Sequence, residues 1–245
     1  MSAVPPMPAR SHVALASVLA RERPASATPT FGAGGEEPWT AALSGAGRAL
    51  YLVAEHEAPS TDHALAFDRW SAAADSTDRR TLDGLEGPVL DIGCGPGRMV
   101  RAALDAGLNA MGIDVAHAAV EVCVSAGLPV LRRSVFDRLP REGRWGAVLL
   151  LDGNIGIGGA VAALLTRCSD LLRPGGMLVA ETHPTPAHDR TFLGTLVDAT
   201  GGRSDSFPWT ELGADPLAAL ATTAGFDVDA TWQVGERTFS RFRRR

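Results

Sequence analysis

The sequence predicts an α/β protein built around one doubly wound, mostly parallel sheet. Three observations support this fold class. Strand-like and helix-like segments alternate from Gly87 to the C-terminus, which is the pattern of parallel strands joined by helices. Residues 147–151 are continuously apolar, as expected for a strand that is covered on both faces. A glycine-rich turn at residues 93–97 follows one strand and precedes a helix.

The individual elements follow from local patterns. Gly107 and Gly127 end the first two helices, as glycine does just beyond a helix, and the turn at 173–176 ends the third. Asp215-Pro216 is expected to cap and open a further helix. The expected helices are 97–106, 116–126 and 159–172, and the expected strands are 88–92, 109–113, 129–135, 146–151 and 176–181. A terminal antiparallel hairpin at 226–234 and 237–243 brings the Rossmann-like sheet to seven strands.

The N-terminal part of the chain has a different composition. Residues 1–35 are rich in Pro, Ala, Ser and Gly, and a disordered tail is expected there. Helices are expected around Trp39–Val53 and Ala64–Leu85, where apolar side chains recur at roughly helical spacing. The predicted organisation is therefore a tail, a helical lid at 36–86 and a single α/β domain at 87–245.

The composition excludes several function classes. A net charge of −5 disfavours a general binder of nucleic acid or of anionic membranes. The chain contains no lysine, which excludes lysine Schiff-base chemistry and a P-loop lysine. Its three cysteines imply no disulfide framework, and no apolar run reaches the roughly 18 residues of a membrane span. We expect a cytoplasmic protein, and no metal site is predicted.

The turn after the first strand carries the strongest functional signal. Asp91-Ile92-Gly93-Cys94-Gly95-Pro96-Gly97 places glycines where a bulky polar ligand can lie on the backbone without meeting a Cβ atom. Asp114 closes the next apolar run, where nucleotide-binding folds hold ribose hydroxyls. The dinucleotide pattern needs its third glycine one residue later. Asp91 would also repel a pyrophosphate but tolerates a zwitterionic methionine, so S-adenosylmethionine is favoured over NAD.

Residues 91–97 resemble motif I of the class I S-adenosylmethionine-dependent methyltransferases. The resemblance extends over most of residues 87–245, including Asp114 and the turn at 173–176. More narrowly, four segments resemble a little-characterised group of bacterial methyltransferases: Arg69-Trp70, residues 134–140, residues 151–159 and residues 207–209. In that group an acid-proline pair is expected after Gly159, where this chain has Ala160-Val161.

This resemblance implies cofactor contacts at the ends of the first four strands. Glycine amides would meet the methionine portion, Asp114 would accept hydrogen bonds from the ribose hydroxyls, and Asp137 would receive the adenine amino group. Asp152 would face the methionyl end or the substrate. The alternative role for Asp114 is a helix N-cap. The predicted cofactor-binding residues are Asp91, Gly93, Cys94, Gly95, Gly97, Asp114, Val115, Val135, Phe136, Asp137 and Asp152.

Substrate-binding and catalytic residues are indicated less directly. Residues 151–159 hold four glycines, more than a short turn requires, which favours close approach of a ligand, with Asn154 presenting its amide. Trp70 and Trp209 are candidates for an apolar substrate pocket. His183 is the predicted general base if the acceptor must lose a proton, and His56 and His63 are weaker candidates. The long connection from residue 183 to residue 212 is expected to carry specificity.

The sequence therefore predicts an S-adenosylmethionine-dependent methyltransferase that acts on a small molecule by in-line displacement. Two alternatives stay open. A protein of the same fold that binds the cofactor as a sensor or scaffold would also lack a diagnostic base. A nicotinamide-dependent oxidoreductase would bind NAD instead. The sequence does not determine the methyl acceptor, the atom methylated or the oligomeric state.

Overall fold

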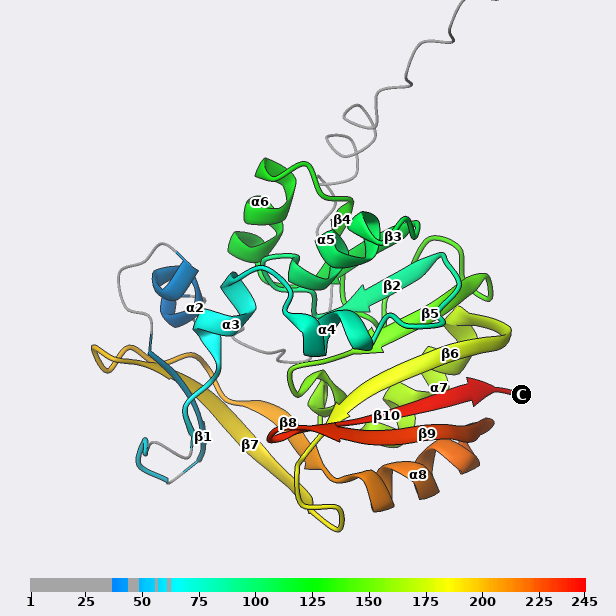
Figure 1. Ribbon diagram of the computed structural model, residues 1–245. Helices are drawn as coiled ribbons and strands as arrows, with labels where there is room; N and C mark the ends of the chain where they lie inside the picture. The colour runs from blue at the N-terminus through cyan, green and yellow to red at the C-terminus, as the bar shows by residue number, and fades with distance from the viewer. Residues whose placement is uncertain (1–36, 44–48, 56, 61–62) are drawn as a thin grey trace, which may run out of the picture.

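The computed structural model describes residues 37–43, 49–55, 57–60 and 63–245 of the chain. Its main feature is a seven-stranded sheet in the order β4-β3-β2-β5-β6-β10-β9 (Figure 1). The strands are β2 (Val89–Ile92), β3 (Ala110–Asp114), β4 (Val130–Arg132), β5 (Trp145–Leu150), β6 (Leu172–Thr182), β9 (Phe226–Val234) and β10 (Arg237–Arg244). The first five are parallel, and β10 is antiparallel to both β6 and β9. The predicted sheet and its C-terminal hairpin are confirmed.

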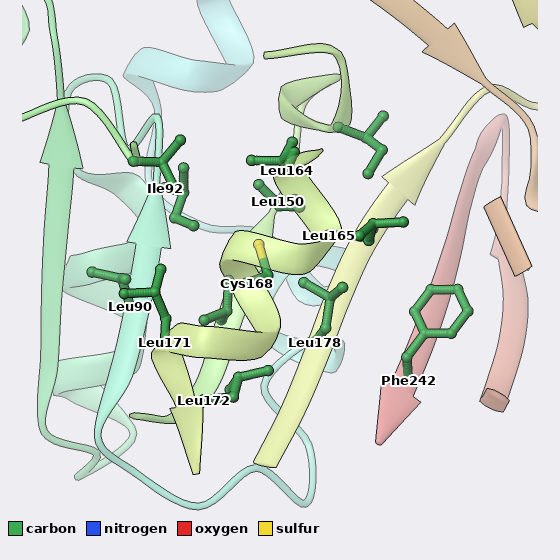
Figure 2. Packing of buried hydrophobic residues seen from close by; sticks show 14 of the residues in the cluster. Leu90, Ile92, Leu150, Leu164, Leu165, Cys168, Leu171, Leu172, Leu178 and Phe242 are labelled. Atoms are coloured by element: carbon green, nitrogen blue, oxygen red, sulfur yellow. The ribbon is translucent and has the colours of Figure 1, made fainter. Parts of the chain in front are cut away.

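Helices cover both faces of this sheet because alternate residues of a strand point to opposite sides. On one side Leu90, Leu150 and Leu178 pack with side chains of the helix α7, as Figure 2 shows. On the other side Val89 and Leu149 pack with the helix α5. All six residues of β5 are buried, which explains its continuously apolar sequence. The helices are α5 (Arg98–Asp105), α6 (His117–Ser125), α7 (Val161–Leu171) and α8 (Ala214–Thr223).

A second sheet joins two parts of the chain that the sequence analysis assigned differently. Strands β1 (Leu50–Ala54), β7 (Asp189–Asp198) and β8 (Phe207–Leu212) form an antiparallel sheet in the order β1-β7-β8. The helix predicted up to Val53 is therefore wrong at its end, and the long connection after His183 contains two strands. A short apolar run is ambiguous between helix and strand, and the partner of β1 lies far along the chain.

The predicted helix at 64–85 is also interrupted. It consists of α3 (Phe67–Ser71) and α4 (Ser76–Arg80), which follow α2 (Glu37–Leu43). Asp75 starts a new helix because its carboxylate accepts a hydrogen bond from the Asp78 amide at 2.8 Å and its amide donates to the Asp78 carboxylate. At α8, Gly213 rather than Asp215 is the N-cap. The expected tail at 1–35 lies outside the described residues.

The second sheet and α2 and α3 lie beside the end of the main sheet toward which β2 and β6 point (Figure 1). Parallel α/β sheets bind ligands at this carboxyl end. Within the described residues, no helix has the length and apolar character needed to span a bilayer.

Candidate active site

A cavity of about 410 Å³ lies at the carboxyl ends of β2, β3 and β5. One side is formed by strand ends and turns of the main sheet. The other side is formed by Trp39, Leu52, Leu65, Trp70 and Trp209 from α2, β1, the α3 region and β8. The sequence-predicted residues on its wall are Asp91, Gly93, Cys94, Gly95, Asp114, Val115, Val135, Phe136, Asp152, Asn154, Trp70 and Trp209. Gly97, Asp137 and His183 are not on this wall.

The glycines of the turn after β2 serve different purposes. A Cβ atom on Gly95 would have no neighbour closer than 3.9 Å, at Trp39, and Gly95 has a φ of 51° that favours glycine. On Gly93 it would lie 2.7 Å from the Asn154 amide, and on Gly97 it would lie 2.8 Å from Cys123 Sγ. Gly97 therefore allows helix α6 to pack closely, and its role as a cofactor-binding residue stays a prediction.

Asp114 ties the end of β3 to this glycine turn. Its Oδ2 accepts a hydrogen bond from the Gly95 amide at 2.8 Å, and its Oδ1 accepts one from the Ala116 amide at 2.8 Å. Helix α6 begins later, after Ala116, with no side-chain cap. Asp114 is therefore not the N-cap. Asp114 also lines the cavity, and a carboxylate has about four acceptor positions in all.

The turn after β4 places Ser134 rather than Asp137 on the cavity wall. Asp137 Oδ2 accepts a hydrogen bond from the Ser134 amide at 3.0 Å, so its carboxylate closes the turn. Ser134, Val135 and Phe136 line the cavity. The prediction that Asp137 receives the adenine amino group is not supported by this placement, because the side chain points back to its own loop.

Asp91 is a buried carboxyl at the end of β2. Its side chain is 4% exposed and lies on the cavity wall. Burial raises the pKa of Asp91 to about 8, and the carboxylates of Asp152 and Asp114 add to the rise, while Arg98 opposes it. Within the described part of the chain, no hydrogen bond reaches this carboxyl group. A cationic ligand group would fit here.

Asp152 belongs to a compensated charge network beneath the cavity, in which three arginines face three carboxylates. Its Oδ1 accepts a hydrogen bond from Arg69 at 2.8 Å, and its Oδ2 pairs with Arg98. Arg98 also pairs with Asp78. Arg237 donates to Asp78 at 2.8 Å and to both oxygens of Glu181 at 2.8 Å. Asp152 lines the cavity, but its charge is already balanced by arginine, and its contact with cofactor or substrate stays a prediction.

Most of this network could not be predicted from the sequence. Arg98 occupies the position at which the dinucleotide pattern needs its third glycine. Asp78 comes from α4 and Arg237 from β10, so their meeting depends on how distant segments pack. The buried network holds the pKa of Asp78 and Glu181 below their usual values despite burial, because arginine hydrogen bonds outweigh desolvation.

Of the four glycines in the segment after β5, two accommodate β8, whereas Gly153 and Gly158 line the cavity. A Cβ atom on Gly156 would lie 2.6 Å from Trp209 Cε2, and one on Gly159 would lie 2.8 Å from Pro208 Cβ. The Asn154 amide donates to the carbonyls of Ile92 at 2.8 Å and Gly93 at 3.0 Å. The hypothesis that these glycines expose the backbone to substrate is therefore wrong for Gly156 and Gly159, and Asn154 fastens the first turn.

His183 lies beside the main cavity rather than in it. It lines a smaller cavity of about 160 Å³ that also borders Trp209 and Glu211. Its Nδ1 accepts a hydrogen bond from the Thr185 amide at 3.1 Å, and its ring stacks on His188 at 3.7 Å. Burial, and then His188, lower the pKa of His183. The role of His183 as the general base stays a prediction, although its side chain does not line the main cavity. His63 pairs with Glu57, and His56 lies outside the described residues.

Comparison with known proteins relates this chain to methyltransferases. Residues 89–176 match the family model described as a methyltransferase domain, and no curated protein matches the chain. A methyltransferase from Bacteroides fragilis, crystallised with S-adenosyl-L-homocysteine, is 19% identical, with a TM-score of 0.71, over 88% of this chain and 97% of that chain.

Two other similar structures are N-methyltransferases by name. The 1,6-didemethyltoxoflavin-N1-methyltransferase of Burkholderia thailandensis is 19% identical over 69% of this chain and 77% of that chain, with a TM-score of 0.54. The glycopeptide N-methyltransferase MtfA, complexed with S-adenosylmethionine, is 16% identical over 77% of this chain and 100% of that chain, with a TM-score of 0.54. Residues 89–176 therefore match a methyltransferase domain, and the chain has the fold of S-adenosylmethionine-dependent methyltransferases.

Proposed function

We propose that the 410 Å³ cavity binds S-adenosylmethionine along the ends of β2, β3 and β4 and receives a small-molecule methyl acceptor on its tryptophan-lined side. The observation that carries this proposal is the combination of Asp91, Gly95 and Asp114 on one wall. The cofactor supplies an electrophilic methyl group on a sulfonium. Its methionine end carries an ammonium, and its sugar carries two hydroxyls that can donate hydrogen bonds to a carboxylate.

The wall residues fit these groups. Asp91 presents a buried carboxyl to the cofactor ammonium, and the open face of Gly95 lets the methionine portion lie against the backbone. Asp114, followed by Val115, accepts hydrogen bonds from the ribose. Val135 and Phe136 border the adenine, and Ser134 Oγ takes the place proposed earlier for Asp137. Cys94 fills space beside the turn, where the neighbouring Cys123, and then burial, raise the pKa of its thiol.

The acceptor side is built from residues outside the main sheet. Trp39, Trp70 and Trp209 line it with Leu52 and Leu65. We propose that residues 36–86 act together with strands β7 and β8, which belong to the methyltransferase domain at 87–245, as the acceptor-binding part. Such a wall excludes water and orients the nucleophile for in-line attack, which are the main protein contributions to methyl transfer. The relative crystallised with 1,6-didemethyltoxoflavin acts on a small molecule by its name.

Thermal unfolding with and without ligand tests the cofactor assignment. S-adenosylhomocysteine is expected to raise the Tm, because a ligand that binds only the folded chain stabilises it, whereas NAD is expected to have no effect. Asp114→Ala should weaken S-adenosylhomocysteine binding about tenfold or more, because a hydrogen bond to a charged group contributes about 1.5–3 kcal/mol. Asp83→Ala, at an exposed acid away from the cavity, is the control. Equal affinities of the two variants would refute the role of Asp114.

Catalysis is tested with labelled S-adenosylmethionine and fractionated small-molecule extracts. A methylated product supports the enzyme, and cofactor binding without any product supports the sensor. We propose that the protein works in the cytoplasm, a reducing compartment in which its buried thiols Cys94, Cys123 and Cys168 stay free.

A further inference from the structure

Glu211 is a carboxylate on the acceptor side of the cavity. It lies two residues after Trp209 on β8, so both side chains face the same side of the strand. Glu211 lines the main cavity together with Trp70 and Trp209, and it also lines the smaller cavity beside it. It therefore stands where the two cavities meet, among indole rings.

The charge of Glu211 is not balanced by an arginine in the described part of the chain. Its cross-strand neighbour Arg190 instead pairs with Glu57 at 2.7 Å and lies 4.7 Å over the ring of Phe192. The ion-pair partner of Glu211 is His188, whose Nε2 lies 3.2 Å from Glu211 Oε2. The His188 ring in turn stacks on His183.

The other carboxylates on the wall have different surroundings. Asp152 is balanced by arginines, Asp114 accepts two backbone hydrogen bonds, and Asp91 lies deep at the end of β2. Glu211 alone among these four combines a position on the tryptophan side with a histidine partner. A carboxylate beside indole faces favours an N–H donor or an ammonium and disfavours an anionic acceptor.

We propose that the methyl acceptor is an amine and that Glu211 binds its N–H group and accepts its proton. This inference rests on the proposed function. The nitrogen lone pair forms the N–CH₃ bond while the S–CH₃ bond breaks, and the positive charge moves from sulfur to nitrogen. Glu211 then takes the N–H proton, so the product is a neutral methylated amine. His188 Nε2 positions the carboxylate, and Glu211, whose side chain is 35% exposed, releases the proton to solvent.

The test uses three probes that share one indole ring and differ in the polar group: tryptamine, tryptophol and indole-3-acetate. Their binding is measured by calorimetry to the full chain saturated with S-adenosylhomocysteine. Tryptamine is expected to bind about tenfold more tightly than either of the others, as for one hydrogen bond to a charged group. Equal binding of the three probes, or binding of none, overturns the proposal.

Substitutions test whether Glu211 causes the expected preference for tryptamine. Glu211→Gln keeps the shape and removes the charge, so the tryptamine preference should be lost while the affinity for S-adenosylhomocysteine is kept. Glu121→Gln, at an exposed residue paired with His117 on α6, should change neither. His188→Gln keeps a donor near Nε2 and should retain the preference, whereas His188→Ala should reduce it.

The two proposals fail in different ways. If S-adenosylhomocysteine does not bind the unaltered chain, the proposed function is wrong. If it binds and Glu211→Gln still prefers tryptamine, the role of Glu211 is wrong and the proposed function stands. A pH profile of amine methylation that is unchanged in His188→Ala would show that His188 does not position Glu211.

Discussion

The Asp91 carboxyl shows how one buried residue joins stability to cofactor binding. Its pKa is raised to about 8, chiefly by burial, whereas an aspartate in an unfolded chain titrates near about 4. Between these two pH values the folded chain therefore holds a proton that the unfolded chain has released. The free energy of unfolding contributed by Asp91 is fully present below about pH 4 and is lost as the pH rises to about 8.

Asp91→Asn should remove this pH dependence, because the amide does not titrate. Without ligand, the variant is expected to match the unaltered chain near pH 4 and to exceed it at pH 8 by about 1 kcal/mol or more, or about 2–4 °C in Tm. Its affinity for S-adenosylhomocysteine should fall, because the ammonium loses its carboxylate. Unfolding curves across this pH range and calorimetry measure both effects. If Asp91→Asn is no more stable than the unaltered chain at pH 8, burial of Asp91 does not lower the free energy of unfolding at that pH.

At the scale of elements, the docking of β8 on the segment after β5 positions the acceptor side of the cavity. Gly156 and Gly159 bring the two segments together, and the Thr210 hydroxyl donates to the Gly159 carbonyl at 2.9 Å. Trp209 and Glu211 reach the cavity only because β8 lies this close. The position of these two cavity residues therefore depends on glycines that pack against β8.

Gly156→Ala should disturb this docking. Its new Cβ atom would crowd Trp209 and the backbone carbonyl of Thr210, so we expect a loss of roughly 1–3 kcal/mol in the free energy of unfolding together with weaker acceptor binding. Gly175→Ala is the control: its Cβ atom would meet nothing within 4 Å, although its positive φ makes the substitution mildly unfavourable. Urea unfolding compares the two. An acceptor affinity lowered equally by both changes would contradict the docking argument.

The seven strands of the main sheet could be predicted because their signals are local. An apolar run such as residues 147–151, bounded by glycine, indicates a buried strand by itself. Strands β1, β7 and β8 could not be predicted, since Leu50–Ala54 becomes a strand only by pairing with residues 194–198. The roles of Asp91 and Asp114 follow from their positions at strand ends, whereas that of Glu211 depends on the second sheet.

At the scale of the whole molecule, the network of Arg69, Arg98 and Arg237 with three carboxylates connects distant parts of the chain. Arg69 and Asp78 belong to the segment before the main sheet, Arg98 to α5 and Arg237 to the last strand, β10. The network therefore fixes the acceptor-binding part against the cofactor-binding part. Figure 1 shows α3 and α4 beside the end of the sheet where these residues meet.

Removing the central arginine should destabilise the fold strongly. Arg98→Met removes the arginine that pairs with both Asp78 and Asp152 in the protein interior. Removing one partner of a buried ion pair typically costs about 3–5 kcal/mol in the free energy of unfolding. Arg173→Met is the matched control, because its pair with Glu86 is largely exposed and such pairs contribute about 0–1 kcal/mol. Chemical unfolding measures both. Similar losses in the two variants would show that the buried network adds no stability.

The sequence by itself determined the order of the main strands and helices, the glycine turn and the acids that close β2 and β3. These features depend on residues that are close together along the chain, and local sterics and hydrophobic patterning specify them. Only the tertiary structure decided which acids are balanced by arginine and which face the acceptor. Charge compensation depends on distance in space, and the partners of Asp152 and Glu211 come from segments that meet only when the chain folds.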